Sequence, residues 1–113
     1  MGLLVEGRWV DRWYDTSNSG GRFERKPRTF RDTISSEGPF TPEAGRYHLY
    51  VSYACPWAHR TLIMRALAGL EGLISVSVVD PRMGEQGWAF ARPNSGALSG
   101  AGVDPLYGAE HLH

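Results

Sequence analysis

Hydrophobic and polar positions change their period twice in the middle of the chain. Residues 46–52 form an apolar, aromatic and β-branched run, which is typical of a strand. Beyond Pro56, apolar residues recur on one face of a helix, at Leu62, Ile63, Ala66, Leu67 and Leu70. Residues 74–79 are again β-branched and alternating, and Asp80-Pro81 ends them. The pattern predicts a strand, a helix with one buried face, and a second strand.

Short joints connect these three elements. Gly69 and Gly72 bracket the end of the helix, where a left-handed C-cap favours glycine. A strand, helix and strand joined in this way form a right-handed βαβ unit with parallel strands. Two strands and one helix do not cover both faces of a sheet or close its edges. We therefore predict an α/β chain that looks like the opening part of a larger fold.

The two ends of the chain carry weaker patterns. Residues 1–46 are rich in turn-forming residues, and their aromatic side chains have no helical or strand period. We interpret them as an extended arm that packs onto a body, because a disordered tail would leave many aromatics in water. Residues 83–90 are expected to be a loop with two exposed aromatics, and residues 94–102 a Gly/Ser-rich linker. Asp104 with Pro105 after it predicts the start of a helix.

Composition narrows the class of protein. The chain has 113 residues, the size of one small domain, and twelve basic and twelve acidic residues give a formal net charge of zero. This balance argues against binding to nucleic-acid phosphates. The longest apolar stretch is interrupted by serines and is too short to span a bilayer, and the start lacks the basic region of a signal peptide. One cysteine cannot form an internal disulfide, so we expect a cytoplasmic protein.

That single cysteine, Cys55, stands where the first strand meets the helix. Because Pro56 suits the first helical position, Cys55 falls at the N-cap, and the backbone N–H groups of Trp57 and Ala58 are expected to point toward its sulfur. These donors and the positive end of the helix dipole favour thiolate over thiol. The alternative is an inert cysteine that fills space at the junction.

The absence of a partner thiol limits the mechanism open to Cys55. Position 58 is alanine, so no second cysteine stands three residues on. A mixed disulfide on Cys55 must therefore be opened by an outside thiol, and in a reducing compartment the abundant candidate is glutathione. The residues predict a monothiol transfer or reduction that depends on glutathione.

Several segments match the pattern of a known family. They are Tyr47 to Ser52, Ala54-Cys55-Pro56-Trp57-Ala58-His59-Arg60, Gly87-Trp88-Ala89-Phe90, and upstream Trp13-Tyr14-Asp15-Thr16 and Gly20-Gly21-Arg22-Phe23. With these segments the chain resembles the glutathionyl-hydroquinone reductases, the Xi class of glutathione transferases. The resemblance implies the N-terminal portion of such a protein. Residues 1–46 would be its extended arm and residues 47–113 an incomplete thioredoxin-like domain, with the helical C-terminal domain absent.

The resemblance also implies an activity. The family's cysteine attacks the thioether sulfur of a glutathionyl-hydroquinone, becomes a mixed disulfide with glutathione, and is freed by a second glutathione; Cys55 matches this nucleophile. Trp88 matches the tryptophan that contacts glutathione, although it could instead anchor its loop on the arm. Glutathione is then a co-substrate, no metal is expected, and full-length members are expected to form homodimers. Half of the glutathione site has no counterpart here, so the alternative is a non-catalytic fragment that binds glutathione or a partner weakly.

Two further patterns are less specific. Arg22, Arg25 and Arg28 could bind an anion, but a solvated charged face explains them as well. His111 and His113 have a spacing that can bind a metal, but no third ligand accompanies them.

Overall fold

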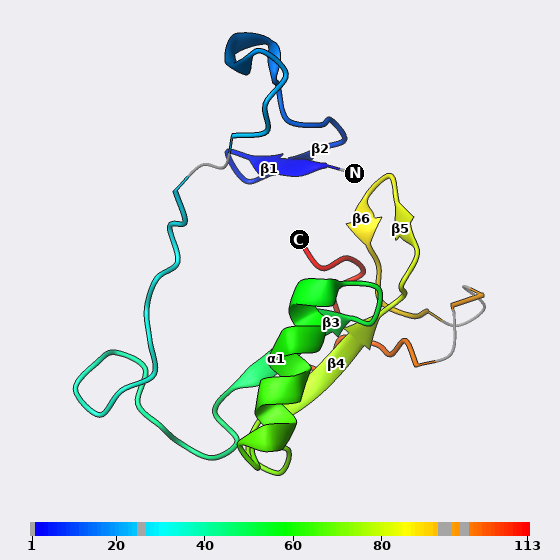
Figure 1. Cartoon of the computed structure of the whole chain (residues 1–113). Helices are drawn as coiled ribbons and strands as arrows, with labels where there is room; N and C mark the ends of the chain where they lie inside the picture. The colour runs from blue at the N-terminus through cyan, green and yellow to red at the C-terminus, as the bar shows by residue number, and fades with distance from the viewer. Residues whose placement is uncertain (1, 25–26, 93–95, 98–99) are drawn as a thin grey trace.

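A parallel pair of strands forms the centre of the chain. The computed structural model describes residues 2–24, 27–92, 96–97 and 100–113. Strand β3 (His48–Ser52) pairs in parallel with β4 (Ser75–Val79), and helix α1 (Pro56–Leu67) connects them. Figure 1 shows α1 lying across one face of this pair. The predicted α/β order and the parallel pairing are confirmed, and both strands begin one or two residues later than predicted.

The two faces of the β3–β4 pair differ in polarity. Because side chains alternate along a strand, the paired residues Val51 and Val78 share one face, and Tyr50 and Ser77 share the other. The ring of Tyr50 contacts Phe90, a residue beyond β4. The C-terminal segment therefore covers the polar face, and α1 covers the apolar one.

The ends of α1 agree with the local sequence. Cys55 is the N-cap with an extended backbone, and Pro56 is the first helical residue. Gly69 has a φ of 65°, the left-handed conformation predicted for the C-terminus, whereas Gly72 does not take a positive φ. Arg65, in the last turn, donates from Nε to the carbonyl of Ile74 at 2.8 Å and from Nη2 to that of Glu71 at 2.7 Å. These bonds tie the end of the helix to the start of β4.

The predicted burial of one helical face is wrong. In the described part of the chain no side chain of α1 is buried. Leu67 is 77% exposed, Ile63 is exposed, and Leu62 is half-buried. The reason is the width of the sheet: two strands lie about 5 Å apart, whereas a helix with its side chains is about 10 Å across. A two-stranded sheet is too narrow to cover the apolar arc of α1.

The arm contains a short hairpin that the sequence pattern did not predict. Strands β1 (Leu3–Val5) and β2 (Arg8–Val10) are antiparallel, and the turn between them has positive φ at Glu6 and Gly7. Each strand has three residues, which is too few to show an alternation of apolar and polar positions. The arm also contains a 3₁₀ turn, η1 (Ser17–Ser19).

Trp9 connects this hairpin to later parts of the chain. The indole N–H of Trp9 donates to the carbonyl of Glu85 at 2.8 Å, and its ring stacks on His113 with centroids 4.4 Å apart. In the C-terminal half of the predicted arm, residues 27–46 form an extended segment, the strap, which is exposed at nearly every position (Figure 1). The radius of gyration is 16.5 Å, compared with about 13 Å for a compact domain of this length. The strap and hairpin account for this expansion.

The segment after β4 is more ordered than predicted. A hairpin of β5 (Met83–Gly84) and β6 (Gly87–Trp88) lies within the expected loop. Trp88 is half-buried and Phe90 is only 4% exposed, so the prediction of two exposed aromatics is wrong. Residues 88–90 pair with residues 110–112 through backbone hydrogen bonds, and this pairing turns Phe90 onto Tyr50. Residues 94, 95, 98 and 99 of the predicted linker lie outside the described residues.

The helix predicted at Asp104 is absent from the described residues 100–113, which contain a turn instead. The carboxylate of Asp104 accepts hydrogen bonds from the backbone N–H groups of Leu106, Tyr107 and Ala109 at 3.0, 3.3 and 3.0 Å. Gly108 takes a φ of 64°, which interrupts a right-handed helix. Asp104 thus caps a turn as predicted, but this turn does not continue into a helix.

Candidate functional site

The thiol of Cys55 is positioned by a tight turn at the carboxyl end of β3. The N–H of Cys55 donates to the carbonyl of Ser52 at 3.0 Å, and the hydroxyl of Ser52 accepts from the N–H of Ala54 at 3.3 Å. Ser52 is buried, so this turn starts from a fixed part of the sheet. The carbonyl of Cys55 then accepts the first helical hydrogen bond, from His59 at 3.0 Å. The turn therefore fixes the cysteine backbone from both sides.

The side chain of Cys55 is free and half-exposed. In the described structure it accepts no hydrogen bond at the helix cap, so the predicted contacts from Trp57 and Ala58 to its sulfur are not formed. N–H groups in the first turn of a helix still lack partners within the helix and remain available to an anionic group placed there. What the structure supplies is a reachable thiol at the positive end of α1.

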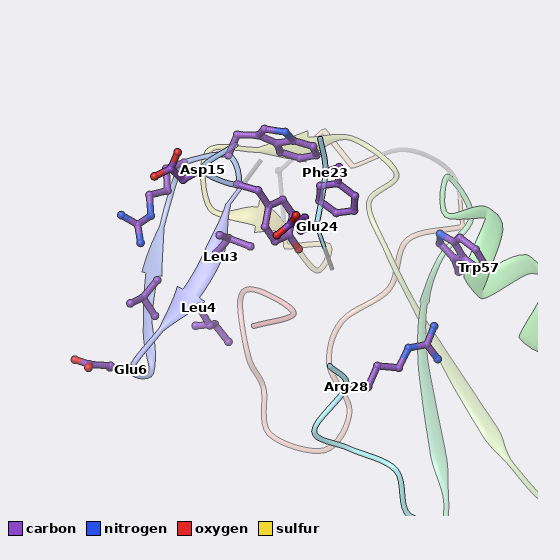
Figure 2. Close-up of a pocket in the computed structure, with 12 residues that line it drawn as sticks. Leu3, Leu4, Glu6, Asp15, Phe23, Glu24, Arg28 and Trp57 are labelled. Carbon is purple, nitrogen blue, oxygen red and sulfur yellow. The ribbon is translucent and has the colours of Figure 1, made fainter. Parts of the chain in front are cut away.

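Trp57, two residues beyond the thiol, is exposed, and the guanidinium carbon of Arg60 lies 5.6 Å from the centre of its ring. Its carbonyl accepts a hydrogen bond from the hydroxyl of Thr61 at 3.2 Å. The Trp57 ring lines the large cavity between α1 and the arm, with Arg28 of the strap nearby (Figure 2). The first turn of α1 therefore offers an aromatic surface beside the cysteine.

Trp88 lies on β6, in the hairpin that follows β4. Its backbone carbonyl accepts from the N–H of Leu112 at 3.0 Å. Its indole N–H is buried and has no hydrogen-bond partner among the described residues. No hydrogen bond or ring contact joins Trp88 to Cys55 in the described part of the chain. A glutathione contact by Trp88 stays a prediction, and the tryptophan that anchors the β5–β6 hairpin to the arm is Trp9, which the sequence did not single out.

The polar face of the sheet carries a network that sequence reasoning also missed. The ring nitrogens of His48 lie 2.6 Å from the hydroxyl of Ser75 and 2.9 Å from that of Ser77. The hydroxyl of Tyr50 donates to Asp104 at 2.6 Å. Desolvation, with a smaller effect of the Asp104 hydrogen bond, raises the pKa of Tyr50 to about 12. Ser75 and Ser77, which alternate with valines in β4, were the available signal for this network.

The other candidate ligands lie in the arm and at the C-terminal end of the chain. Arg22 and Arg28 lie on the exposed arm and strap, and Arg25 lies outside the described residues. His113 is stacked on Trp9, and its ring centre is 5.5 Å from that of His111. The described residues contain no group of three or more His, Cys, Asp or Glu side chains placed to hold a metal ion. They also contain no helix long and apolar enough to cross a membrane.

Comparison with known proteins supports the resemblance seen around Cys55. No protein-family model matches the chain. The glutathionyl-hydroquinone reductase PcpF of Sphingobium chlorophenolicum is 53% identical over 115 residues, and the glutathionyl-hydroquinone reductase YqjG of Escherichia coli is 50% identical over 121 residues. Both alignments cover 100% of this chain, but 34% of PcpF and 36% of YqjG. The chain is a relative of the glutathionyl-hydroquinone reductases.

Solved structures agree with this relationship to the glutathionyl-hydroquinone reductases. The Xi glutathione transferase of Phanerochaete chrysosporium matches with a TM-score of 0.72 and 60% identity, over 79% of this chain and 29% of that one. The Xi-class enzyme of Natrialba magadii matches with a TM-score of 0.76 and 47% identity, over 99% of this chain and 32% of that one. The glutathione-bound structure of Escherichia coli YqjG matches with a TM-score of 0.60 and 58% identity, over 69% of this chain and 24% of that one. The predicted incomplete thioredoxin-like fold is therefore confirmed.

The matched region is only part of each of these relatives. The chain spans about a third of the length of the curated glutathionyl-hydroquinone reductases that it matches. Their activity, substrates and assembly belong to the whole proteins.

Proposed function

We propose that this chain acts in the glutathione-dependent reduction of glutathionyl-hydroquinones, with Cys55 as the nucleophile and glutathione as co-substrate. The observation that carries the proposal is the placement of Cys55, a free and reachable thiol at the N-cap of α1. The names of PcpF and YqjG support the substrate class, and the glutathione-bound relative supports the co-substrate. No metal takes part in this scheme, and a cytoplasmic location suits it because glutathione keeps thiols reduced there.

The proposed reaction has two sulfur transfers. The Cys55 thiolate attacks the glutathionyl sulfur, the carbon–sulfur bond breaks, and the aryl carbon takes the electron pair and a proton to give the free hydroquinone. A mixed disulfide between Cys55 and glutathione remains. A second glutathione thiolate attacks that disulfide, and oxidised glutathione leaves while the Cys55 thiol is regenerated. The two glutathione sulfurs supply the two electrons that reduce the aryl carbon.

Trp88 belongs to this proposal as a contact for glutathione. Its indole N–H is sealed inside the protein, so glutathione would meet the accessible part of the ring and not this donor. Replacing Trp88 with Phe removes the N–H and keeps a ring, whereas Leu removes the ring. We expect Trp88→Leu to weaken glutathione binding and Trp88→Phe to have a smaller effect, as measured by calorimetric titration.

A single-turnover experiment tests the nucleophile. Without free glutathione, the chain mixed with a glutathionyl-hydroquinone should release one hydroquinone per molecule and gain one glutathione, as seen by intact mass. Because Cys55 is the only cysteine, the adduct needs no further assignment. The Cys55→Ser variant should do neither, while Ala68→Ser at the far end of α1 should react normally. Hydroquinone release by Cys55→Ser at the normal rate would contradict the proposal.

One observation favours a second candidate function. The outer face of α1 is exposed in the described structure, at residues such as Met64 and Leu67. A chain that binds glutathione or a partner without turnover would fit this open surface, and its adduct on Cys55 would form without catalytic cycles when glutathione is added. Counting hydroquinone released per chain in excess glutathione separates the two: many equivalents indicate catalysis, and no more than one indicates binding alone.

A further inference from the structure

Ser52, the last residue of β3, is among the most buried side chains of the described chain. It is 2% exposed, its neighbour Val51 is equally buried, and its partner across the sheet, Val79, is completely buried. A polar side chain is stable in such a place only when its hydroxyl is hydrogen-bonded. The hydrogen bonds of Ser52 therefore indicate what this residue does in the fold.

Ser52 binds two successive backbone N–H groups of the turn that leads into α1. Its carbonyl oxygen accepts from the N–H of Cys55 at 3.0 Å, and its Oγ accepts from the N–H of Ala54 at 3.3 Å. A serine hydroxyl that accepts from the N–H two residues later closes a turn in the way that a backbone carbonyl does. One residue thus fixes the turn before the cysteine through both its main chain and its side chain.

The residues inside the turn have little packing of their own. Tyr53 is 62% exposed and Ala54 is also exposed. One edge of the Tyr53 ring lies close to Gly100, where an added Cβ would be 3.2 Å from Cε2 of the ring. Because an exposed turn depends on its hydrogen bonds for a fixed conformation, the hydroxyl of Ser52 restricts the backbone of both residues. This restriction passes to Cys55, which follows directly.

We propose that Ser52 is a positioning residue for Cys55, and that its hydroxyl keeps the thiol at the N-cap of α1. The inference rests on the proposed function of Cys55 and extends it to a buried residue that acts through the cysteine. At the N-cap, an ionised sulfur lies beside first-turn N–H groups that have no partner within the helix. Without the hydroxyl, the N–H of Ala54 turns to water and the cysteine spends part of its time away from this position.

The first test compares two buried serines of the same sheet. Ser52→Ala removes the hydroxyl of the turn, whereas Ser77→Ala on β4 removes a hydroxyl that lies 2.9 Å from Nε2 of His48 and controls for lost stability. The rate of Cys55 alkylation by iodoacetamide at pH 7 is divided by the rate at pH 10, where an ordinary thiol is ionised, so that differences in access cancel. We expect this ratio to fall about 3- to 10-fold in Ser52→Ala, the effect of one hydrogen bond, and to stay unchanged in Ser77→Ala.

The second test uses the proposed reaction in a single turnover. At saturating glutathionyl-hydroquinone, Ser52→Ala should release hydroquinone about 3- to 10-fold more slowly. The substrate concentration that gives half of the maximal rate should not change, because Ser52 is buried and does not meet the substrate. Ser52→Thr keeps a hydroxyl and should restore the rate. If its added methyl group disturbs the packing, as seen in backbone amide spectra, the two alanine variants decide the question.

Two results would overturn the role of Ser52: an unchanged alkylation ratio in Ser52→Ala, or an equal fall of that ratio in Ser77→Ala. The proposed function fails in a different way. If the unmodified chain releases no hydroquinone but the alkylation ratio still falls only in Ser52→Ala, the proposed reaction is wrong and the positioning of the thiol by Ser52 stands.

Discussion

The hydroxyl of Tyr50 lies 2.6 Å from Oδ1 of Asp104 and joins the central strand β3 to a turn 54 residues later. Asp104 is only 6% exposed and also accepts three backbone hydrogen bonds. The Tyr50 hydrogen bond is the main cause that lowers the pKa of Asp104, and desolvation is a smaller effect in the opposite direction. This pair therefore holds the C-terminal segment on the polar face of the sheet.

The first prediction concerns pH. Because the folded-state pKa of Asp104 lies below its ordinary value of 3.8, its stabilising effect is complete above pH 3.8 and is lost as the pH falls through the lower value. The pKa of Tyr50 is raised from 10.0 to about 12, so its contribution is complete below pH 10 and is lost as the pH rises toward 12. Urea unfolding at several pH values should show a plateau between these limits.

The matching variant is Tyr50→Phe. It should flatten the alkaline fall in stability and also make the acid fall smaller, because Asp104 then loses the hydrogen bond that contributes most to lowering its pKa. Tyr53→Phe, at an exposed tyrosine just beyond β3, serves as the control. An unchanged acid limb in Tyr50→Phe would show that the pair does not govern the titration of Asp104.

A second prediction concerns the joint between the arm and the β5–β6 hairpin. A Cβ at Gly87 would lie 2.9 Å from Cη2 of Trp9, and Gly87 has a φ of 77°. Trp9 is held by its hydrogen bond to the carbonyl of Glu85 and by its stacking on His113, and a shift of the ring would disturb both contacts. Gly87→Ala should therefore lower the free energy of unfolding by roughly 2–4 kcal/mol, from backbone strain and steric overlap together.

Gly69→Ala separates these two causes. Gly69 also has a positive φ, 65°, but nothing lies within 4 Å of a Cβ placed there. The Gly69→Ala variant should therefore lose only the contribution of backbone strain to the free energy of unfolding, about 1–2 kcal/mol. Thermal unfolding monitored by circular dichroism measures both variants, and equal losses would show that the Trp9 contact adds nothing.

A third prediction concerns the joint after α1. Arg65 donates to two carbonyls beyond its helix, and its side chain is largely buried. Arg65→Met keeps the apolar stem but leaves both carbonyls without this donor, at a cost of about 2–3 kcal/mol. Arg60→Met, on the exposed part of the same helix, should cost less than about 0.5 kcal/mol. Chemical denaturation of the two variants provides the comparison.

A fourth prediction changes the chemistry of the thiol. Ala58→Cys creates a second thiol one turn from Cys55, where it can attack a mixed disulfide from within the chain. Glutathione should then leave the adduct without added thiol. The product should be a disulfide between the two cysteines, which intact mass shows as two hydrogens lighter than the reduced variant. Ala68→Cys is the control, since about 13 residues of helix place it roughly 20 Å away, too far for a disulfide. A stable adduct on Ala58→Cys would contradict the geometry of the first turn.

The central unit was predictable because its signals are local and agree with one another. The β-branched runs, Pro56 and Gly69 each specify a backbone state at their own position, and together they define β3, α1 and β4. Cys55 could be placed by the same logic, since its position depends only on where the strand ends and the helix starts.

The features that could not be predicted depend on distant partners. The hairpin of β1 and β2 is too short for a period, and Phe90 is buried only because residues 110–112 pair beside it. Asp104 carries the correct capping chemistry, but Gly108 ends the turn. The exposure of α1 depends on how many strands lie beneath it, a quantity that the pattern of the helix itself does not contain.

The strap also determines how strongly the N-terminal hairpin stays attached to the rest of the chain. Trp9 is 76 residues from Glu85, and residues 27–46 between them lie almost entirely in solvent. The arm therefore behaves as a tethered ligand of its own chain, held in part by the Trp9 indole and favoured by the high effective concentration that a tether provides. A protease cut in the strap would turn this intramolecular contact into a bimolecular one, and at micromolar protein the arm would dissociate from the body it now covers.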